Sequence, residues 1–316
     1  KTVIFNIFNK IEIVLLNSQA NKLTMKKKIL LYLICFFALQ IKAQIIPQNG
    51  TIASSPEFIV LKNVSVYIRP GLKIEKASIL ISNGKIIDIG KKITIPKNAI
   101  EYDLEGKTIV PAFIELYTNI GMPKGSEQNY SPRPQIESSK TGPYYWNEAI
   151  HPEIEAHNFF TVDSKANENY LKSGFGFAVS HVQDGIVRGS GTLVSLGDEN
   201  SSKNTISLKS GMFYSFSKGT STQSYPSSQM GSIALLRQSL YDLKFYSENE
   251  KHDQSISLER WKEGIGLPSL FKVNDKWEIL RAEKIANEFQ LKMNYIGSGN
   301  EYAALSSLKS VKGALI

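Results

Sequence analysis

The sequence holds one cysteine and four histidines among 316 residues, and this scarcity excludes several kinds of site. The cysteine, Cys35, lies in an apolar stretch near the start of the chain. The chain beyond that stretch can therefore form no disulfide, thiol nucleophile or thiolate metal site. Two motifs are also absent. Without Gly-x-Ser-x-Gly there is no serine nucleophile elbow, and without Gly-x-Gly-x-x-Gly there is no dinucleotide-binding fingerprint.

No apolar run is long enough for a bilayer span of about 20 residues. The longest candidate, Ile29 to Leu39, follows three lysines and leads to the small residue Ala43. This order of charged, apolar and small residues predicts a secretory signal peptide over 25–43 and export to the periplasm or the cell exterior. The alternative is an uncleaved anchor. After cleavage, no stable membrane span is expected.

The segments on either side of the signal peptide are expected to lack a fold of their own. Residues 1–24 are interpreted as an upstream extension that precedes the native start. Residues 44–56 are polar and hold two prolines and a glycine, which is typical of a flexible N-terminus.

The chain that remains after removal of the predicted signal peptide has little net positive charge. The formal charge of the whole sequence is +8, from 37 basic and 29 acidic residues. The leader through Ala43 holds seven of those lysines and one glutamate, which leaves 30 basic and 28 acidic residues. A nearly balanced chain without a basic, aromatic-rich run indicates no nucleic-acid partner.

Residues 57–110 predict a small β-sandwich. Short β-favouring runs cover 58–61, 64–68, 77–81 and 85–89, and Asn63 separates the first two. Asn83-Gly84 stands between the last two runs and predicts a type I′ hairpin turn.

Residues 111–316 predict the first part of a βα barrel, because strand-like and helix-like segments alternate there. The chain as a whole is therefore expected to be α/β, a sandwich beside a partial (β/α)8 barrel that is truncated at the C-terminus. Residues 120–170 are polar and proline-rich, and they are interpreted as an insertion after the first strand. Strands are expected at 114–119, 174–182, 293–296 and 313–316, and helices at 228–248, 282–291 and 302–308.

Gly106 to Asn119, with the sequence GKTIVPAFIELYTN, resembles the start of the first barrel strand in the amidohydrolase superfamily. The hairpin Ile79–Gly90 and the element Asp103–Lys107 resemble the family's layout before that strand. Later segments also resemble imidazolonepropionase-like and exported tandem amidohydrolase-like proteins. The resemblance implies a hydrolase of non-peptide carbon–nitrogen bonds that uses metal-activated water.

The family's metal motif is altered in this chain. Where the resemblance implies His-x-His, Tyr117 and Asn119 stand instead. Two side chains two apart on a strand share a face, so a His pair would aim at one metal ion. A protonated phenol and a neutral amide are weak ligands, and we expect no cofactor in this chain. Glu115 stands where the family usually has Asp, which implies a supporting role.

Zinc or a similar divalent metal remains an expectation for a longer polypeptide. The resemblance implies a Lys or His on the fourth strand, two further His and an Asp. All of these are expected beyond residue 316.

His181 and Asp184 are the candidate catalytic residues of this chain. His181 comes at the carboxyl end of the second predicted barrel strand, where barrel active sites lie. The histidine would act as a proton shuttle or substrate contact, or it is a loop residue held by a hydrogen bond. His151, His157 and His252 do not form a ligand pattern.

Two further segments contain polar or charged residues. The hydroxyl-rich segment 215–228 around Lys218 would bind an anion at the next helix N-terminus, or it is a capped loop. Arg188, between glycines, is interpreted as part of a strand.

Two functions follow as hypotheses. The first is the N-terminal part of an exported amidohydrolase-like hydrolase with a small-molecule substrate, inactive without the remainder of the polypeptide. The second is a catalytically inactive binding or scaffolding module. Metal ligands downstream would favour the first.

Overall fold

The computed structural model describes residues 57–123, 133–197, 201–249 and 251–316. The predicted upstream extension, signal peptide and flexible N-terminus lie outside these residues. Two compact units are present. Unit 1 runs to Val66 and from Ile74 to Thr108, and unit 2 comprises Tyr67–Lys73 and Ile109–Ile316. In the described residues no helix is both long and apolar enough to cross a membrane.

Unit 1 is built around a β-sheet in the order β3-β2-β1-β4, with β5 paired to β1. Its strands are β1 (Ile59–Arg69), β2 (Leu72–Ser82), β3 (Lys85–Gly90), β4 (Ile100–Asp103) and β5 (Thr108–Ile109). Val60, Val64 and Ile79 are among the side chains that form its buried core. The predicted second layer of a sandwich stays a prediction.

The hairpin prediction at Asn83-Gly84 is confirmed. Both residues have positive φ, 49° and 71°, as a type I′ turn requires, and Ser82 pairs with Lys85 across it. The predicted break at Asn63 is wrong, because β1 continues through it. Asn63 adopts φ 56° within the strand, and its amide donates to the carboxylate of Asp103 at 3.1 Å.

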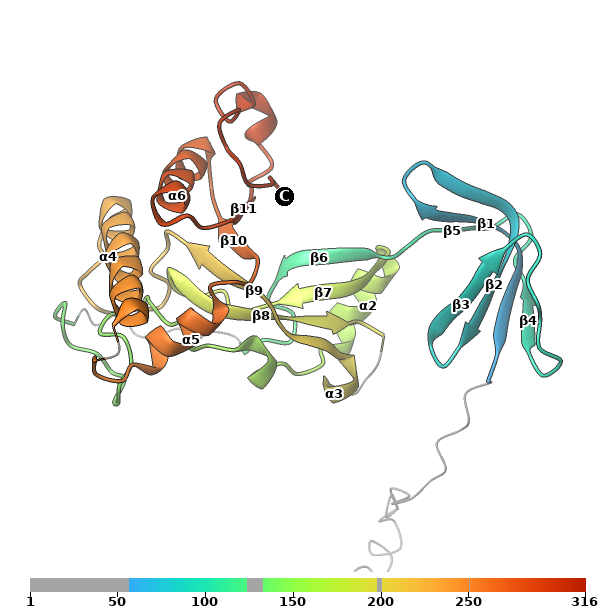
Figure 1. Ribbon diagram of the computed structural model, residues 1–316, viewed down its shortest axis with the longest axis horizontal. Coiled ribbons are helices and arrows are strands. Elements are labelled where there is room, and N and C mark those ends of the chain that lie inside the picture. The colour runs from blue at the N-terminus through green and yellow to red at the C-terminus, as the bar shows by residue number, and fades with distance from the viewer. Residues whose placement is uncertain (1–56, 124–132, 198–200, 250) are drawn as a thin grey trace, which may run out of the picture. The chain divides into compact units, whose positions relative to one another are not determined.

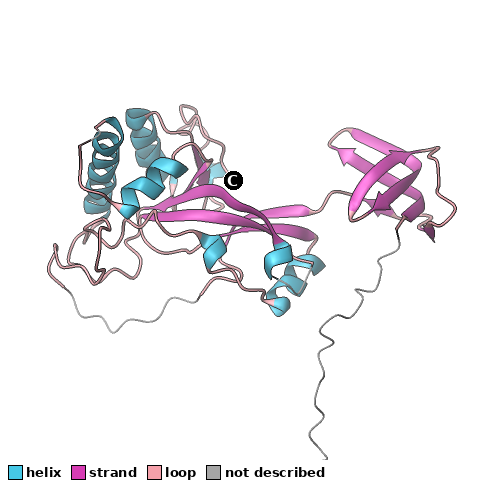
Figure 2. Ribbon diagram, turned by 60° about the horizontal axis from the view of Figure 1, so that its bottom comes forward, coloured by secondary structure: helices cyan, strands magenta, loops and turns pink. Residues whose placement is uncertain are grey.

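Unit 2 contains a six-stranded sheet with helices beside it (Figures 1 and 2). Its strands are β6 (Phe113–Thr118), β7 (Phe175–Ser180), β8 (Val187–Ser195), β9 (Thr205–Ser215), β10 (Ser269–Lys272) and β11 (Met293–Ile296). Its helices are η1 (Ala156–Asn158), α2 (Ser164–Lys172), α3 (Ser201–Asn204), α4 (Gln229–Glu248), α5 (Ile256–Gly264), α6 (Lys276–Phe289) and η2 (Glu301–Ala304).

The strand order is β11-β10-β9-β8-β7-β6, and one strand runs against the others. β6 pairs with β7, and β10 pairs with both β9 and β11, all in parallel. β8 is antiparallel to both β7 and β9. The carboxyl ends of the five parallel strands and the beginning of β8 therefore face the same edge of the sheet. A purely alternating βα pattern does not account for β8.

Alternate residues of β9 separate the two faces of this sheet. Met212 and Tyr214 pack with the helical side, where Trp261 of α5 is fully buried. Phe213 packs on the opposite face with Leu270 of β10 and Ile296 of β11. This alternation is what a strand with two covered faces requires.

The helix predicted over 228–248 is confirmed as α4. Ser228 caps it by accepting a hydrogen bond from the backbone of Gly231 at 3.2 Å, and the capped-loop interpretation of the preceding segment holds. Leu236 and Leu240 are buried against the sheet, as their spacing predicts.

The C-terminal residues add to the sheet beside β11. The backbone of Tyr295 donates to Ala314 at 2.8 Å, and Ile316 donates back to Tyr295 at the same distance. This is parallel pairing through an isolated bridge between Tyr295 and Leu315, so the strand predicted at 313–316 is reduced to one bridge. The helix predicted at 302–308 is reduced to the short η2 followed by turns.

The segment interpreted as an insertion is part of the core of unit 2 where the structure describes it. Tyr145 and Ile150 are 6% and 0% exposed, and Ile150 forms a parallel bridge with Val187 of β8. The segment contributes to the support of β8 and of the residues that follow.

Candidate functional site

Five polar side chains lie at the carboxyl ends of the parallel strands of unit 2. Tyr117 is near the end of β6, His181 directly follows β7, Ser215 ends β9 and Lys272 ends β10. Arg188 joins them from the opposite direction, because it is the second residue of the antiparallel β8. We call this set the carboxyl-end cluster.

Arg188 is the centre of the carboxyl-end cluster. Its side chain is buried, with 6% of the residue exposed. The guanidinium donates from Nε to the carbonyl of Gly185 at 3.0 Å, from one Nη to the Tyr117 hydroxyl at 2.7 Å, and from the other to Ser215 Oγ at 3.0 Å. All three acceptors are neutral.

No carboxylate forms an ion pair with Arg188 among the described residues. Buried charges are normally paired, because removing a charge from water is costly. Arg188 is thus a fixed and uncompensated positive charge in this part of the molecule.

Two cations, Arg188 and Lys272, lie near Tyr117. Besides the bond from Arg188, Lys272 Nζ lies 5.8 Å from the centroid of the Tyr117 ring. Lys272 also donates to the carbonyl of Gly297 at 2.7 Å. The backbone N–H of Tyr117 donates to Glu115 Oε1 at 2.9 Å, which agrees with a supporting role for Glu115. Asn119 follows the end of β6 and is exposed.

His181 is completely buried and is held by packing. Its ring stacks on Phe213 with centroids 3.7 Å apart, and it lies 4.8 Å from the ring of Tyr117. Neither ring nitrogen has a hydrogen-bond partner among the described residues. Burial, followed by the nearby charge of Arg188, lowers the pKa of His181 well below its usual value, so the ring is neutral at pH 7.

Asp184 is not brought together with His181 as a proton-transfer pair. Its carboxylate accepts from the backbone N–H of Thr220 at 2.7 Å and from the Thr220 hydroxyl at 2.8 Å. It also lies 3.9 Å from Nε2 of His151. Asp184 therefore joins two loops, and no hydrogen bond to His181 is present in the described part of the chain.

His151 is the second buried imidazole near the carboxyl-end cluster. It is 3% exposed, and its ring nitrogens have no hydrogen-bond partner among the residues described. Burial first, and then the charge of Lys140, lower its pKa to about 4, although Asp184 and Glu153 oppose the shift. His151 is neutral at pH 7 for the same reason as His181.

The remaining candidates lie apart from the carboxyl-end cluster. His157 is 3.8 Å from Glu155, and His252 contacts the carbonyl of Asp253 at 3.1 Å. Lys218 donates to the carbonyl of Gln223 at 2.9 Å, inside its own loop. No three His, Cys, Asp or Glu side chains gather as a metal site within the described ranges.

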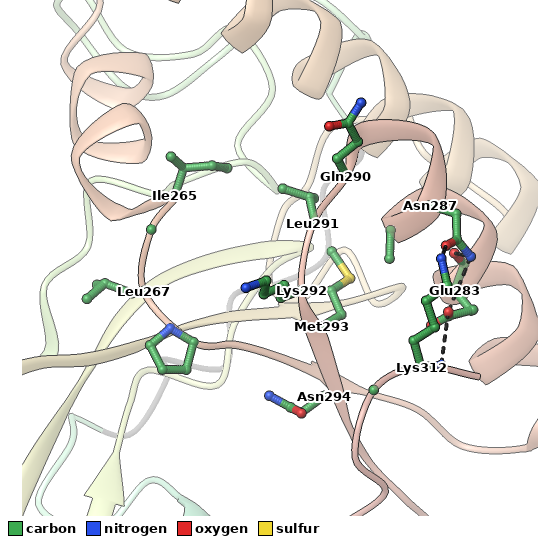
Figure 3. Close-up of a pocket in the computed structure, with 14 residues that line it drawn as sticks. Ile265, Leu267, Glu283, Asn287, Gln290, Leu291, Lys292, Met293, Asn294 and Lys312 are labelled. Atoms are coloured by element: carbon green, nitrogen blue, oxygen red, sulfur yellow. Dashed lines mark hydrogen bonds between the residues drawn. The ribbon is translucent and has the colours of Figure 1, made fainter.

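A pocket of about 1000 Å³ lies at the opposite ends of the same strands (Figure 3). Pro268 and Met293, at the amino ends of β10 and β11, line it. Its one carboxylate, Glu283, already accepts hydrogen bonds from Tyr295, Asn287 and the backbone of Lys312. The pocket is therefore separate from the chemistry at the carboxyl ends.

Known proteins with a similar fold or sequence were compared with this chain. No protein-family model matches. The crystal structure of an amidohydrolase from Thermotoga maritima MSB8 aligns with a TM-score of 0.65 at 20% sequence identity, over 82% of this chain and 69% of that one. A dihydroorotase from Caldanaerobacter subterraneus subsp. tengcongensis is 39% identical over 84 residues, which are 27% of this chain and 19% of the dihydroorotase. The structural likeness shows a shared fold, and the dihydroorotase match shows sequence similarity over a short part of the chain.

The match spans about a fifth of the dihydroorotase, so that protein's activity is not transferred to this chain. A prolidase structure aligns over 82% of this chain and 65% of its own at 11% identity, with a TM-score of 0.36 that is too low to show a shared fold. The amidohydrolase likeness, at 20% identity, shows a common fold.

The end of β10 adds a residue to the carboxyl-end cluster that was not predicted. The fourth parallel strand in chain order is β10, and it ends in Lys272. Neither β9 nor β10 was predicted as a strand. The Lys or His that the resemblance implies on a fourth strand, expected beyond residue 316, stays a prediction. Lys272 is a residue that sequence reasoning missed, and its position at a strand end is the signal that reveals it.

The residues at the altered metal motif do not fit a divalent metal. The Tyr117 hydroxyl accepts a hydrogen bond from a guanidinium, so a divalent metal bound by this hydroxyl would lie close to a positive charge. A unit positive charge and a divalent ion 4 Å apart repel by about 8 kcal/mol at an effective dielectric constant of 20. The structure therefore offers no metal-dependent step at Tyr117 and Asn119.

Proposed function

We propose that this chain is the N-terminal part of an exported, amidohydrolase-like hydrolase that acts on non-peptide carbon–nitrogen bonds of small molecules through metal-activated water. The observation that carries the proposal is the fold likeness to the Thermotoga maritima amidohydrolase over 82% of the chain, with a TM-score of 0.65. The partial (β/α)8 barrel and the sandwich belong to the same proposal.

The role of this chain in that hydrolase is structural at the carboxyl-end cluster. A catalytic metal activates water because its charge lowers the pKa of the bound water. Arg188 and Tyr117 supply neither the ligands nor the room for such a metal. Metal ligands would come from outside the pair Tyr117 and Asn119, so the chain alone is expected to be inactive.

The experiment uses the complete exported polypeptide that contains this chain. Its metal content is measured by elemental analysis, and its hydrolysis of cyclic amides and ureides, dihydroorotate included, is measured with and without a chelator. The proposal expects a stoichiometric divalent metal and hydrolysis that the chelator abolishes. A metal-free and inactive polypeptide would leave the second hypothesis, a binding or scaffolding module.

A further inference from the structure

The carboxyl-end cluster contains a cation where the amidohydrolase layout implies ligands for one. Arg188 donates to the hydroxyl of Tyr117, the first of the two altered positions, at 2.7 Å. Its partners are neutral, and no carboxylate in the described ranges forms an ion pair with it. The position where the resemblance implies a metal ligand is thus in contact with a permanent positive charge.

Several contacts hold the guanidinium in this place. Ser215 Oγ, which accepts from Arg188, also donates to the carbonyl of Gly185 at 3.0 Å, and that carbonyl accepts from Arg188 Nε. The three groups form a closed set of hydrogen bonds. The next residue, Gly189, has φ +79°, and a Cβ there would come within 1.9 Å of the carbonyl oxygen of Ile154. The backbone that carries Arg188 is therefore closely packed.

A second cation strengthens the local field. Lys272 Nζ lies 5.8 Å from the centroid of the Tyr117 ring and donates only to a carbonyl, that of Gly297, among its hydrogen bonds in the described residues. Neither Lys272 nor Arg188 contacts a carboxylate in the described part of the chain. Two cations, Arg188 and Lys272, and one carboxylate, that of Glu115 at the Tyr117 backbone, therefore lie around Tyr117.

We propose that the positive charge of the Arg188 guanidinium takes the place of a metal ion beside Tyr117, at the carboxyl ends of the parallel strands of unit 2. It follows that restoring the two histidines is not sufficient to restore metal binding. A divalent ion would bind beside a guanidinium that cannot move away without breaking its bonds to Gly185 and Ser215. The inference rests on the proposed function only for the position of the ligand pair.

The test compares three variants of the full chain by calorimetric titration with Zn²⁺. The first carries Tyr117→His and Asn119→His. The second adds Arg188→Gln, which removes the charge, and the third adds Arg188→Lys instead, which keeps the charge. We expect the Gln variant to bind Zn²⁺ about 100-fold more tightly than the other two, since a nearby fixed charge acts strongly on a divalent ion.

Two results would overturn the proposal. One is Zn²⁺ binding by the double-His variant within threefold of the affinity of the variant that also carries Arg188→Gln. The other is a folded Arg188→Gln variant that binds no Zn²⁺. Cooperative thermal melting checks folding, and Arg188→Met, an uncharged side chain suited to burial, replaces Gln if the Gln variant does not fold.

The outcome is independent of the hydrolase test. A metal-free, inactive polypeptide would end the hydrolase proposal and leave the affinity ratio unchanged. An affinity ratio near one would end the role of Arg188 and leave the metal content of the unmodified polypeptide unchanged.

Discussion

The stability of unit 2 is expected to fall steeply in mild acid because of His151. Its pKa is lowered from 6.5 to about 4 in the folded chain, first by burial and then by Lys140. Between pH 6.5 and about pH 4, His151 is protonated in the unfolded chain but stays neutral in the folded chain. The unfolded state therefore binds more protons in this window, and the free energy of unfolding decreases as the pH decreases.

The magnitude follows from the size of the shift. About 2.5 pKa units at about 1.4 kcal/mol each give roughly 3 kcal/mol, lost between pH 6.5 and pH 4. This is a large part of the roughly 5–15 kcal/mol that stabilises a typical domain. His181, whose pKa is also lowered by burial, adds to the loss in the same direction.

Urea unfolding at several pH values between 7.5 and 4 measures this effect. All three tryptophans, Trp146, Trp261 and Trp277, lie in unit 2, so their fluorescence reports its unfolding. His151→Phe retains a ring and removes the titrating nitrogens, which have no hydrogen-bond partner among the described residues. The loss of stability between pH 6.5 and 4 should be smaller by about 3 kcal/mol in this variant.

The control is Ile150→Val, a neighbouring fully buried side chain that does not titrate. It should lower stability by about 1 kcal/mol at every pH and keep the slope of the wild-type chain. Slopes are compared because they do not depend on the packing change. Parallel curves for the wild-type chain and His151→Phe would refute the reasoning.

Two packing contacts give further predictions. Gly189→Ala should lower the free energy of unfolding by about 2–4 kcal/mol, because its positive φ and the Ile154 carbonyl both oppose a Cβ. The control is Gly299→Ala, at φ +91° with open space around it, which should lower the free energy of unfolding by only about 1–2 kcal/mol. Equal losses in the two variants would contradict the close packing at Gly189. Trp261→Phe removes the bond from its Nε1 to the Tyr214 hydroxyl, 3.0 Å long and buried. A loss of about 1–3 kcal/mol is expected in urea unfolding, from the lost hydrogen bond and the smaller buried side chain, and a loss below 0.5 kcal/mol would contradict a contribution of this bond.

The elements that sequence reasoning found are those whose local pattern agrees with their packing. The helix α4 has apolar residues at three- and four-residue spacing and a serine cap, and the strands β6, β7 and β11 are short runs rich in aromatic or branched residues. Each pattern comes from contacts that the element makes along its own length.

The strand β9 was missed because its pattern depends on its neighbours. Gly211 lies beside Leu270 and the carbonyl of Pro268, each 2.9 Å from where a Cβ would be. In β8, Gly191 leaves room for the ring of Phe213 at 2.5 Å from its Cβ position. Glycine lowers the strand propensity of a run, yet here it is what permits the close approach of another element.

The candidate site was predicted in part for the same reason. Tyr117 and Asn119 could be singled out because a motif on one strand contains both. Arg188 could not be connected to Tyr117, since 71 residues separate them and the antiparallel β8 has no equivalent in an alternating βα pattern. A sequence motif can show which residues stand at the positions where a resemblance implies ligands. It cannot show which residue from another strand lies beside those positions. In this chain that residue is Arg188, which is positively charged, whereas the surroundings of a metal ion are normally neutral or negatively charged.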